Sequence, residues 1–134
     1  MRLEISRRAD LAVRAMVLLG ASPQRWKALA LAEALHTTAG FVPQVVGPLV
    51  KAGWVHSDPG PTGGYTGAVA LADVSVLQVI EAIDGATDHG RCVVADRECG
   101  GEPCSLHVAW SKARHELMAS LNDTPLSAVA GGAT

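Results

Sequence analysis

Two predicted helices separated by a tight turn constrain the fold of this chain more than any other feature of its sequence. Residues 28–35 carry leucines one helical turn apart, which predicts a short helix. The polar residues 36–38 follow as a turn, and Thr38 is a good N-cap for a helix over residues 39–52. Helix, short turn and helix within about 25 residues is the outline of a helix-turn-helix.

The segments on either side of this motif predict the other parts of a winged helix-turn-helix. Before it, apolar side chains at helical spacing predict a helix over residues 7–19, for which Ser6 is a suitable N-cap. After it, residues 54–56 and 65–71 have the composition of strands and flank a loop rich in glycine and proline. A β-hairpin directly after a helix-turn-helix is a wing.

The second half of the chain predicts two further helices. The first starts near Val76 and ends at Asp84-Gly85, and the second covers about residues 105–122. The apolar stripe of the second helix consists of Leu106, Trp110, Ala113, Leu117 and Leu121. Such a stripe needs a covering surface. We expect a homodimer in which two of these helices cross, in preference to packing on the chain's own winged domain.

The expected fold is mainly α with a small β-hairpin wing, that is, a winged helix-turn-helix plus a long C-terminal dimerisation helix. A DNA-binding domain is expected over residues 1–72. A connecting helix and a cysteine-containing cluster loop follow over residues 73–104, and a dimerisation helix and C-terminal tail over residues 105–134.

Charge and composition narrow the class of protein. Residues 1–70 hold seven Lys/Arg against four acids, whereas residues 71–134 hold four against nine, so only the first half suits a polyanion. No apolar run approaches the ~18–20 residues that span a membrane, and the N-terminus has no secretory stretch. Three cysteines are too few, and odd in number, for a disulfide framework. We therefore expect a cytoplasmic protein without a membrane partner.

The three cysteines share one glycine-containing loop, in the pattern Cys92-x6-Cys99-x4-Cys104-x2-His107. Thiolates bind soft or borderline metal ions, so the loop is a candidate site for zinc or for an iron–sulfur cluster. His107 lies at the start of the final helix, from where its ring could turn toward the same side. The chemistry of these residues does not separate a zinc site from a cluster.

Several stretches of the chain resemble the Rrf2 family of winged-helix regulators. They are MRLEISRRADLAVRAM, LAEALHTTAGFVPQVVGPLVKAGWV, GPTGGY, SVLQVIEAIDG and CSLHVAW, and in this order they cover nearly the whole chain. The resemblance implies a homodimeric transcriptional regulator, expected to be a repressor, that binds a palindromic operator in double-stranded DNA. It also implies a sensor of nitric oxide, redox stress or iron–sulfur supply, without choosing among these signals.

In cluster-bearing members of that family, three loop cysteines ligate a [2Fe–2S] or a [4Fe–4S] cluster. By this resemblance the ligands here are Cys92, Cys99 and Cys104. The fourth ligand stays open. It is His107 if the site resembles that of the family's iron–sulfur regulator IscR. It is Asp10 of the other subunit if the site resembles that of the family's nitric-oxide sensor NsrR.

The resemblance also assigns side chains to DNA recognition. Gln44 is suited to bond an adenine edge, and Phe41 to contact a thymine methyl group, although Phe41 is equally suited to core packing. The expected DNA-binding residues are Thr38, Phe41, Gln44, Lys51, His56, Thr62, Gly63 and Gly64. Further candidate phosphate contacts are the basic side chains of Arg7, Arg8, Arg25 and Lys27.

Two features depart from the family pattern. Pro43 and Pro48 fall inside the expected recognition helix. An interior proline lowers the stability of a helix by about 3 kcal/mol. We therefore expect this helix to begin near Pro43 and to kink or break near Pro48. In the wing, Asp58 stands where many family members carry an arginine suited to a narrow minor groove, and a carboxylate there weakens phosphate attraction.

These departures leave an alternative open: a zinc- or metal-binding interaction protein of the same fold, with weakened or lost DNA binding. The sequence has no nucleophile–base pairing, P-loop or dinucleotide fingerprint. We therefore do not expect an enzyme.

Overall fold

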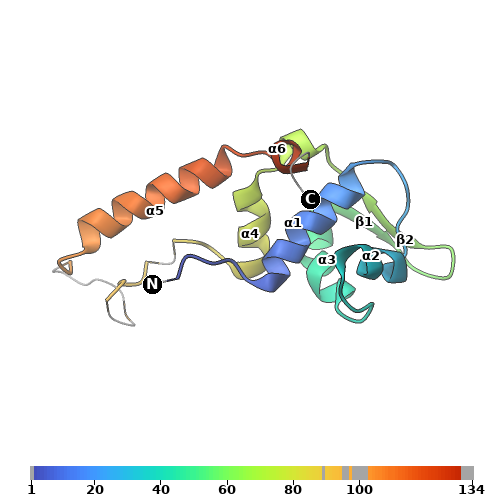
Figure 1. Cartoon of the computed structure of the whole chain (residues 1–134), viewed down its shortest axis with the longest axis horizontal. Coiled ribbons are helices and arrows are strands. Elements are labelled where there is room, and N and C mark those ends of the chain that lie inside the picture. Colours follow the sequence, from blue (N-terminus) through green and yellow to red (C-terminus); the bar gives the residue numbers. More distant parts are fainter. Residues whose placement is uncertain (1, 89, 95–96, 98–102, 131–134) are drawn as a thin grey trace.

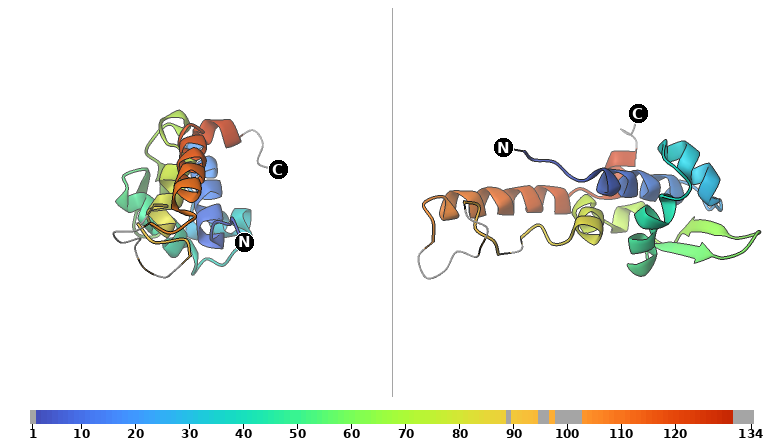
Figure 2. Two further views of the ribbon diagram at one scale, coloured as in Figure 1. Left: turned by 90° about the vertical axis from the view of Figure 1, so that its left-hand side faces the viewer. Right: turned by 90° about the horizontal axis from the view of Figure 1, so that it is seen from below.

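The computed structural model describes residues 2–88, 90–94, 97 and 103–130. Its elements are α1 (Arg7–Gly20), α2 (Ala28–Leu35), α3 (Val42–Lys51), β1 (Val55–Asp58), β2 (Gly64–Gly67), the 3-10 helix η1 (Leu71–Asp73), α4 (Val76–Asp84), α5 (His107–Asn122) and α6 (Leu126–Ala130). They form a winged domain from which α5 extends as an arm (Figure 1). The β1–β2 hairpin and α5 project from opposite ends of the molecule (Figure 2). The expected mainly helical fold with a hairpin wing is confirmed.

Helix α1 lies at the centre of the winged domain. Its start is capped as expected, because the Ser6 hydroxyl accepts a hydrogen bond of 3.0 Å from the Ala9 N–H. Leu11 and Ala15 are fully buried, and α2, α3, α4, α6 and β2 all contact this helix. The alanines let neighbouring helices approach closely, and the buried core consists of aliphatic side chains and Met16.

The helix-turn-helix is present, and α3 begins at Val42, which confirms the expected start near Pro43. The expectation that Thr38 caps a helix from residue 39 is wrong, because residues 38–41 form a separate turn closed by a 3.0 Å bond from the Phe41 N–H to the Thr38 carbonyl. Pro43 then sits in the first turn, where its missing N–H has no intrahelical partner to lose. The expected break near Pro48 is also wrong. The helix continues to Lys51, held by buried side chains on its inner face.

The wing is an antiparallel hairpin in which Val55 pairs with Gly67 and Asp58 with Gly64. Its second strand is shorter than the predicted 65–71, since β2 ends at Gly67. At that point the chain passes close to α1, and a Cβ on Gly67 would lie 2.7 Å from the Leu19 carbonyl oxygen. A side chain at position 67 would therefore clash with α1 where the strand ends.

Helix α4 is confirmed where it was predicted, with a capping box in which Ser75 and Gln78 each bond the other's backbone N–H. Helix α6 was not predicted. Its Leu126 is fully buried, and the Leu126 N–H donates to the Val74 carbonyl at 2.9 Å, so the chain returns to the winged domain after α5. No helix in the described part of the chain is long and apolar enough to cross a membrane.

Candidate DNA interface and cysteine cleft

Helix α3 divides its side chains cleanly between the core and the surface. Val42, Val45, Val46 and Leu49 are fully buried, whereas Gln44 is exposed. Thr38 and Lys51, near the two ends of the helix, are exposed as well. Phe41 is half-buried and packs against the core, in line with its packing alternative. Gln44 and Lys51 on the exposed side of α3, and Thr38 in the turn before it, are therefore available to a groove of DNA, and these contacts remain predictions.

The two glycines of the wing have a structural requirement of their own. A Cβ on Gly63 would lie 2.0 Å from the Asp58 carbonyl oxygen, within the hairpin turn. Gly64 has a φ of +146°, and its Cβ would lie 2.6 Å from the Trp26 carbonyl oxygen. The close approach allows Trp26 and Tyr65 to exchange two backbone hydrogen bonds of 2.8 Å each. His56 and Thr62 are exposed on the same hairpin, where contact with DNA remains a prediction.

Most of the basic residues expected to contact phosphates donate hydrogen bonds within the protein. Arg8 donates to the Ile83 carbonyl at 2.7 Å, and Arg7 to the His36 carbonyl at 3.5 Å. Arg25 and Lys27 both donate to carbonyls of the wing. Lys51 is exposed and has no partner among the residues that the structure describes. The sequence gives no signal of these contacts, because each joins residues at least 29 positions apart.

Cys92, Cys104 and His107 line one open cleft of about 280 Å3. It lies between residues 88 and 90–93 on one side and the first turns of α5 on the other, where Trp110 and Arg114 form part of its wall. Cys99 lies outside the described residues. Within the described ranges, no three His, Cys, Asp or Glu side chains are arranged to hold a metal ion.

The donor set of this cleft suits a soft metal centre. Two thiols and one imidazole face a common space, and these are the ligand types that bind zinc or iron–sulfur clusters. Arg91 also lines the cleft, which favours the negative charge of thiolate ligands. Asp10 does not line it. That side chain is exposed on α1, with the Arg14 guanidinium 4.0 Å away.

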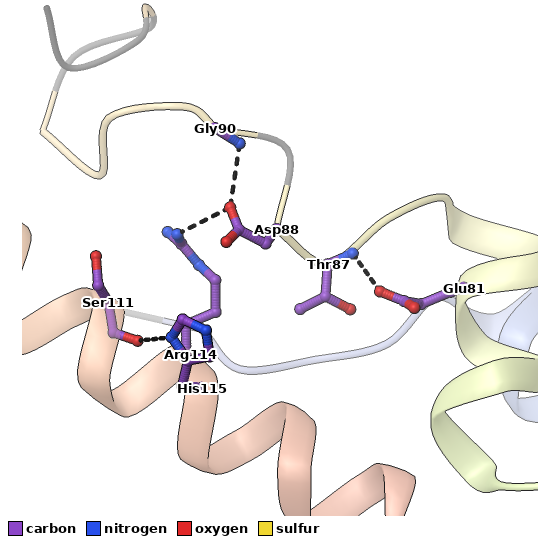
Figure 3. Close-up of polar contacts among 7 residues, drawn as sticks. All are labelled: Glu81, Thr87, Asp88, Gly90, Ser111, Arg114 and His115. Carbon is purple, nitrogen blue, oxygen red and sulfur yellow. Dashed lines mark hydrogen bonds and ion pairs between the residues drawn. The ribbon is translucent and has the colours of Figure 1, made fainter.

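Polar contacts attach the start of the cysteine loop to the helices on both sides of it (Figure 3). The Thr87 N–H donates to Glu81 Oε2 on α4 at 2.6 Å. Asp88 Oδ1 accepts from the Gly90 N–H at 3.2 Å and from Arg114 Nη1 on α5 at 3.4 Å. Sequence reasoning missed Asp88 and Arg114, since neither belongs to the cysteine motif.

Comparison with known proteins gives one family. The Rrf2 family model, described as an iron-dependent transcriptional regulator, matches residues 5–131. The HTH-type transcriptional regulator NMA1593 of Neisseria meningitidis serogroup A is 27% identical over 95% of this chain and 87% of that protein. The transcriptional regulator IscR of Vibrio atlanticus is 31% identical over 72% of this chain, a match that spans only 56% of that IscR.

Solved structures share the fold. CymR (YrzC), described as the global cysteine regulator of B. subtilis, superposes with a TM-score of 0.78 at 21% identity and covers 99% of this chain and 100% of that one. IscR of T. potens superposes with a TM-score of 0.77 at 22% identity, covering 98% of this chain and 89% of that one. At such identities the likeness describes the fold alone.

Proposed function

The chain belongs to the Rrf2 family of transcriptional regulators, and from this premise we propose that it is a homodimeric repressor whose cysteine loop holds an iron–sulfur cluster. The observation that carries the proposal is the cleft in which Cys92, Cys104 and His107 meet. Nitric oxide, redox stress and iron–sulfur supply are the three candidate signals. Each would act by changing whether the cysteine loop holds an intact cluster.

The DNA-reading part of the proposal rests on the exposed face of α3. Gln44 projects from the first half of that helix, where its amide is suited to the edge of an adenine in the major groove. Lys51, at the other end, is suited to a phosphate. The wing would then lie along the DNA backbone, with His56 and Thr62 in contact with it. A homodimer would present two such heads to a palindromic operator.

In the sensing part, Cys92, Cys99 and Cys104 are the proposed thiolate ligands. His107 is our fourth ligand because it lines the same cleft, and Asp10 of the partner subunit is the alternative. When bound, the cluster would supply a centre that reacts with oxidants or nitric oxide. The protein contributes the arginines at the cleft wall and the anchors of the loop, which hold the ligands in a positively charged pocket.

A chain of contacts connects the proposed sensor to the DNA-reading head. The loop bonds α4 through Thr87 and Glu81. The end of α4 bonds the start of α1, because the Ser6 hydroxyl donates to Asp84 Oδ1 at 2.6 Å. Helix α1 in turn packs against α3. A change in the loop would thus reach the recognition helix through two packed helices.

The test is purification without oxygen, followed by measurement of iron, acid-labile sulfide and the visible spectrum. We expect iron and sulfide in the wild type, and their loss in Cys92→Ala and Cys104→Ala. His107→Ala and Asp10→Ala, compared separately, identify the fourth ligand. A colourless wild-type protein that contains zinc, or no metal, would contradict the cluster.

The second candidate is a metal-binding interaction protein of the same fold that no longer binds DNA. It is favoured by the engagement of Arg7, Arg8, Arg25 and Lys27 within the protein. A mobility-shift titration with salt separates the two functions. A regulator that contacts several phosphates loses affinity steeply as salt rises, whereas the alternative shows no binding at low salt.

A further inference from the structure

The geometry points to a latch, made by Arg25, Lys27 and Asp58, that holds the wing in its DNA-binding position. In this inference Arg25 is a positioning residue, and the acidic residue of the wing supports DNA binding instead of opposing it. The inference rests on DNA binding by the winged domain, as proposed above.

The latch begins with two long side chains that reach the hairpin from residues 25–27. Arg25 Nη2 lies 3.2 Å from Asp58 Oδ2, and Arg25 Nη1 donates to the Thr62 carbonyl at 2.8 Å. Lys27 Nζ donates to the Pro61 carbonyl. The two cations therefore hold the end of β1 and the turn that follows it.

The backbone between these cations pairs with the wing through an isolated antiparallel β-bridge. Trp26 exchanges two hydrogen bonds of 2.8 Å with Tyr65 of β2, and its side chain packs against the core. In an extended segment alternate side chains point to opposite sides, so Arg25 and Lys27 share the side away from the core. Gly64 permits the close approach that this pairing requires. The wing is thereby tied to the linker that leads directly into α2.

The charges of the wing explain why a latch matters here. Asp58 is the only acidic residue between residues 54 and 67, and no Lys or Arg lies in that range. Its carboxylate lies between Arg25 on Oδ2 and His56 Nε2, which is 3.2 Å from Oδ1. The acid that departs from the family pattern is thus neutralised by a cation from the neighbouring linker.

Simple electrostatics and the latch make opposite predictions for Asp58→Asn. Removal of a carboxylate near DNA raises affinity if the charge only repels phosphates. If the carboxylate anchors Arg25, the same change frees the wing and lowers affinity, by about threefold on the scale of an exposed ion pair. The sign of the change decides between them.

The experiment uses the full chain and a duplex selected from a random-sequence pool by the wild-type protein. Affinity is measured over a range of salt for Arg25→Gln, Asp58→Asn and the charge swap Arg25→Asp with Asp58→Arg. Lys51→Gln is the matched control, because it also removes one exposed cation. We expect Lys51→Gln to lower the salt slope by about one unit, and Arg25→Gln to lower affinity with the slope unchanged.

A second measurement needs no DNA. Hydrogen exchange at the Tyr65 amide, which donates to Trp26, reports whether the wing is held. We expect exchange about threefold faster in Arg25→Gln and Asp58→Asn, unchanged in Lys51→Gln, and slowed again in the charge swap. Equal exchange in all variants would overturn the latch.

The two readouts also separate this inference from the proposed function. Higher affinity of Asp58→Asn, or a salt slope reduced in Arg25→Gln as in Lys51→Gln, would overturn the positioning role. If the wild type selects no duplex at any salt, DNA binding itself fails and the role in DNA binding fails with it. The exchange data would still decide whether the three side chains hold the wing.

Discussion

The winged domain and the α5 arm differ in the burial of their apolar side chains. In α1, Leu11 is fully buried, and the neighbouring helices bury their own apolar faces against it. In α5 no residue is buried, and Leu117 and Val108 expose 43% and 80% of their surface. The winged domain thus gains its stability within one chain, while α5 presents a surface suited to a partner.

The difference in burial suits the two regions to different roles. The exposed face of α3 and the wing lie on the region that is packed by its own chain. Residues of the first turns of α5 line the cysteine cleft. That end of α5 lies far from the winged domain (Figure 1). A DNA-binding surface needs a rigid scaffold, whereas the proposed sensor site has to change its conformation.

The largest effect should come from the core of the winged domain. Leu11→Ala removes a fully buried side chain at the centre of α1 and is expected to lower the free energy of unfolding by about 3 kcal/mol. Urea denaturation measures it. Val108→Ala on α5 is the control, and we expect almost no change there. Equal losses in the two variants would break the comparison between the regions.

A smaller loss is expected where the wing meets its linker. Gly64→Ala forces a side chain into a φ of +146° and against the Trp26 carbonyl, at a cost of about 2 kcal/mol in unfolding free energy. Gly60→Ala is the matched control, since Gly60 also has a positive φ, +90°, but nothing lies within 4 Å of its Cβ. If Gly60→Ala costs as much in thermal or urea unfolding, backbone strain alone explains the effect and the close approach has no role.

In the proposed dimer, self-association depends on the apolar stripe of α5. Leu117→Glu places a charge on the apolar stripe and should weaken self-association about tenfold, which is ~1.4 kcal/mol. Light scattering or sedimentation over a concentration series measures the change. Ala119→Glu adds the same charge to an exposed position of α5 off the stripe, and should leave the association unchanged. A wild type that is monomeric at every concentration would refute the dimer.

The smallest effect concerns the anchor between the cysteine loop and α5. Arg114→Gln removes the partner of Asp88, and exchange of the Gly90 amide should rise about threefold, or ~0.6 kcal/mol. Global stability should hardly change, because the pair is partly exposed. Lys112→Gln is the control, because it removes another exposed cation of the same helix. It should leave the exchange rate of the Gly90 amide unchanged. A fall in global stability would show that the loop belongs to the core unit.

Local signals in the sequence predicted most of the winged domain. The N-cap Ser6 marks the start of α1, and apolar spacing with the Asp84-Gly85 stop marks α4, so both helices were found nearly to the residue. For α3 the proline indicated the correct start near Pro43, whereas the assignment of Thr38 as the N-cap was wrong, since Thr38 closes a separate turn. Helix α6 was missed because five residues carry too little periodicity, and the segment is held by the burial of Leu126.

The candidate sites were predictable only in part. Cysteine spacing marked the loop, and the glycines of the wing marked the hairpin. Nothing in the residue spacing indicates that Arg25 pairs with Asp58, or Arg114 with Asp88. Ion pairs between distant segments do not recur at a regular interval along the chain. Four of the basic residues that the sequence assigns to phosphates, Arg7, Arg8, Arg25 and Lys27, are engaged with carbonyls or a carboxylate in the folded chain.

The sequence by itself determined the helices of the head, the hairpin and the family, because caps, apolar periods and short motifs act over a few residues. Only the tertiary structure decided which distant side chains meet. It brings Cys92, Cys104 and His107 to one cleft and returns α6 to the core. It also neutralises Asp58 with a cation 33 positions earlier in the chain. The physical reason is that burial and ion pairing depend on distance in space, and for residues far apart in the chain only the tertiary fold sets that distance.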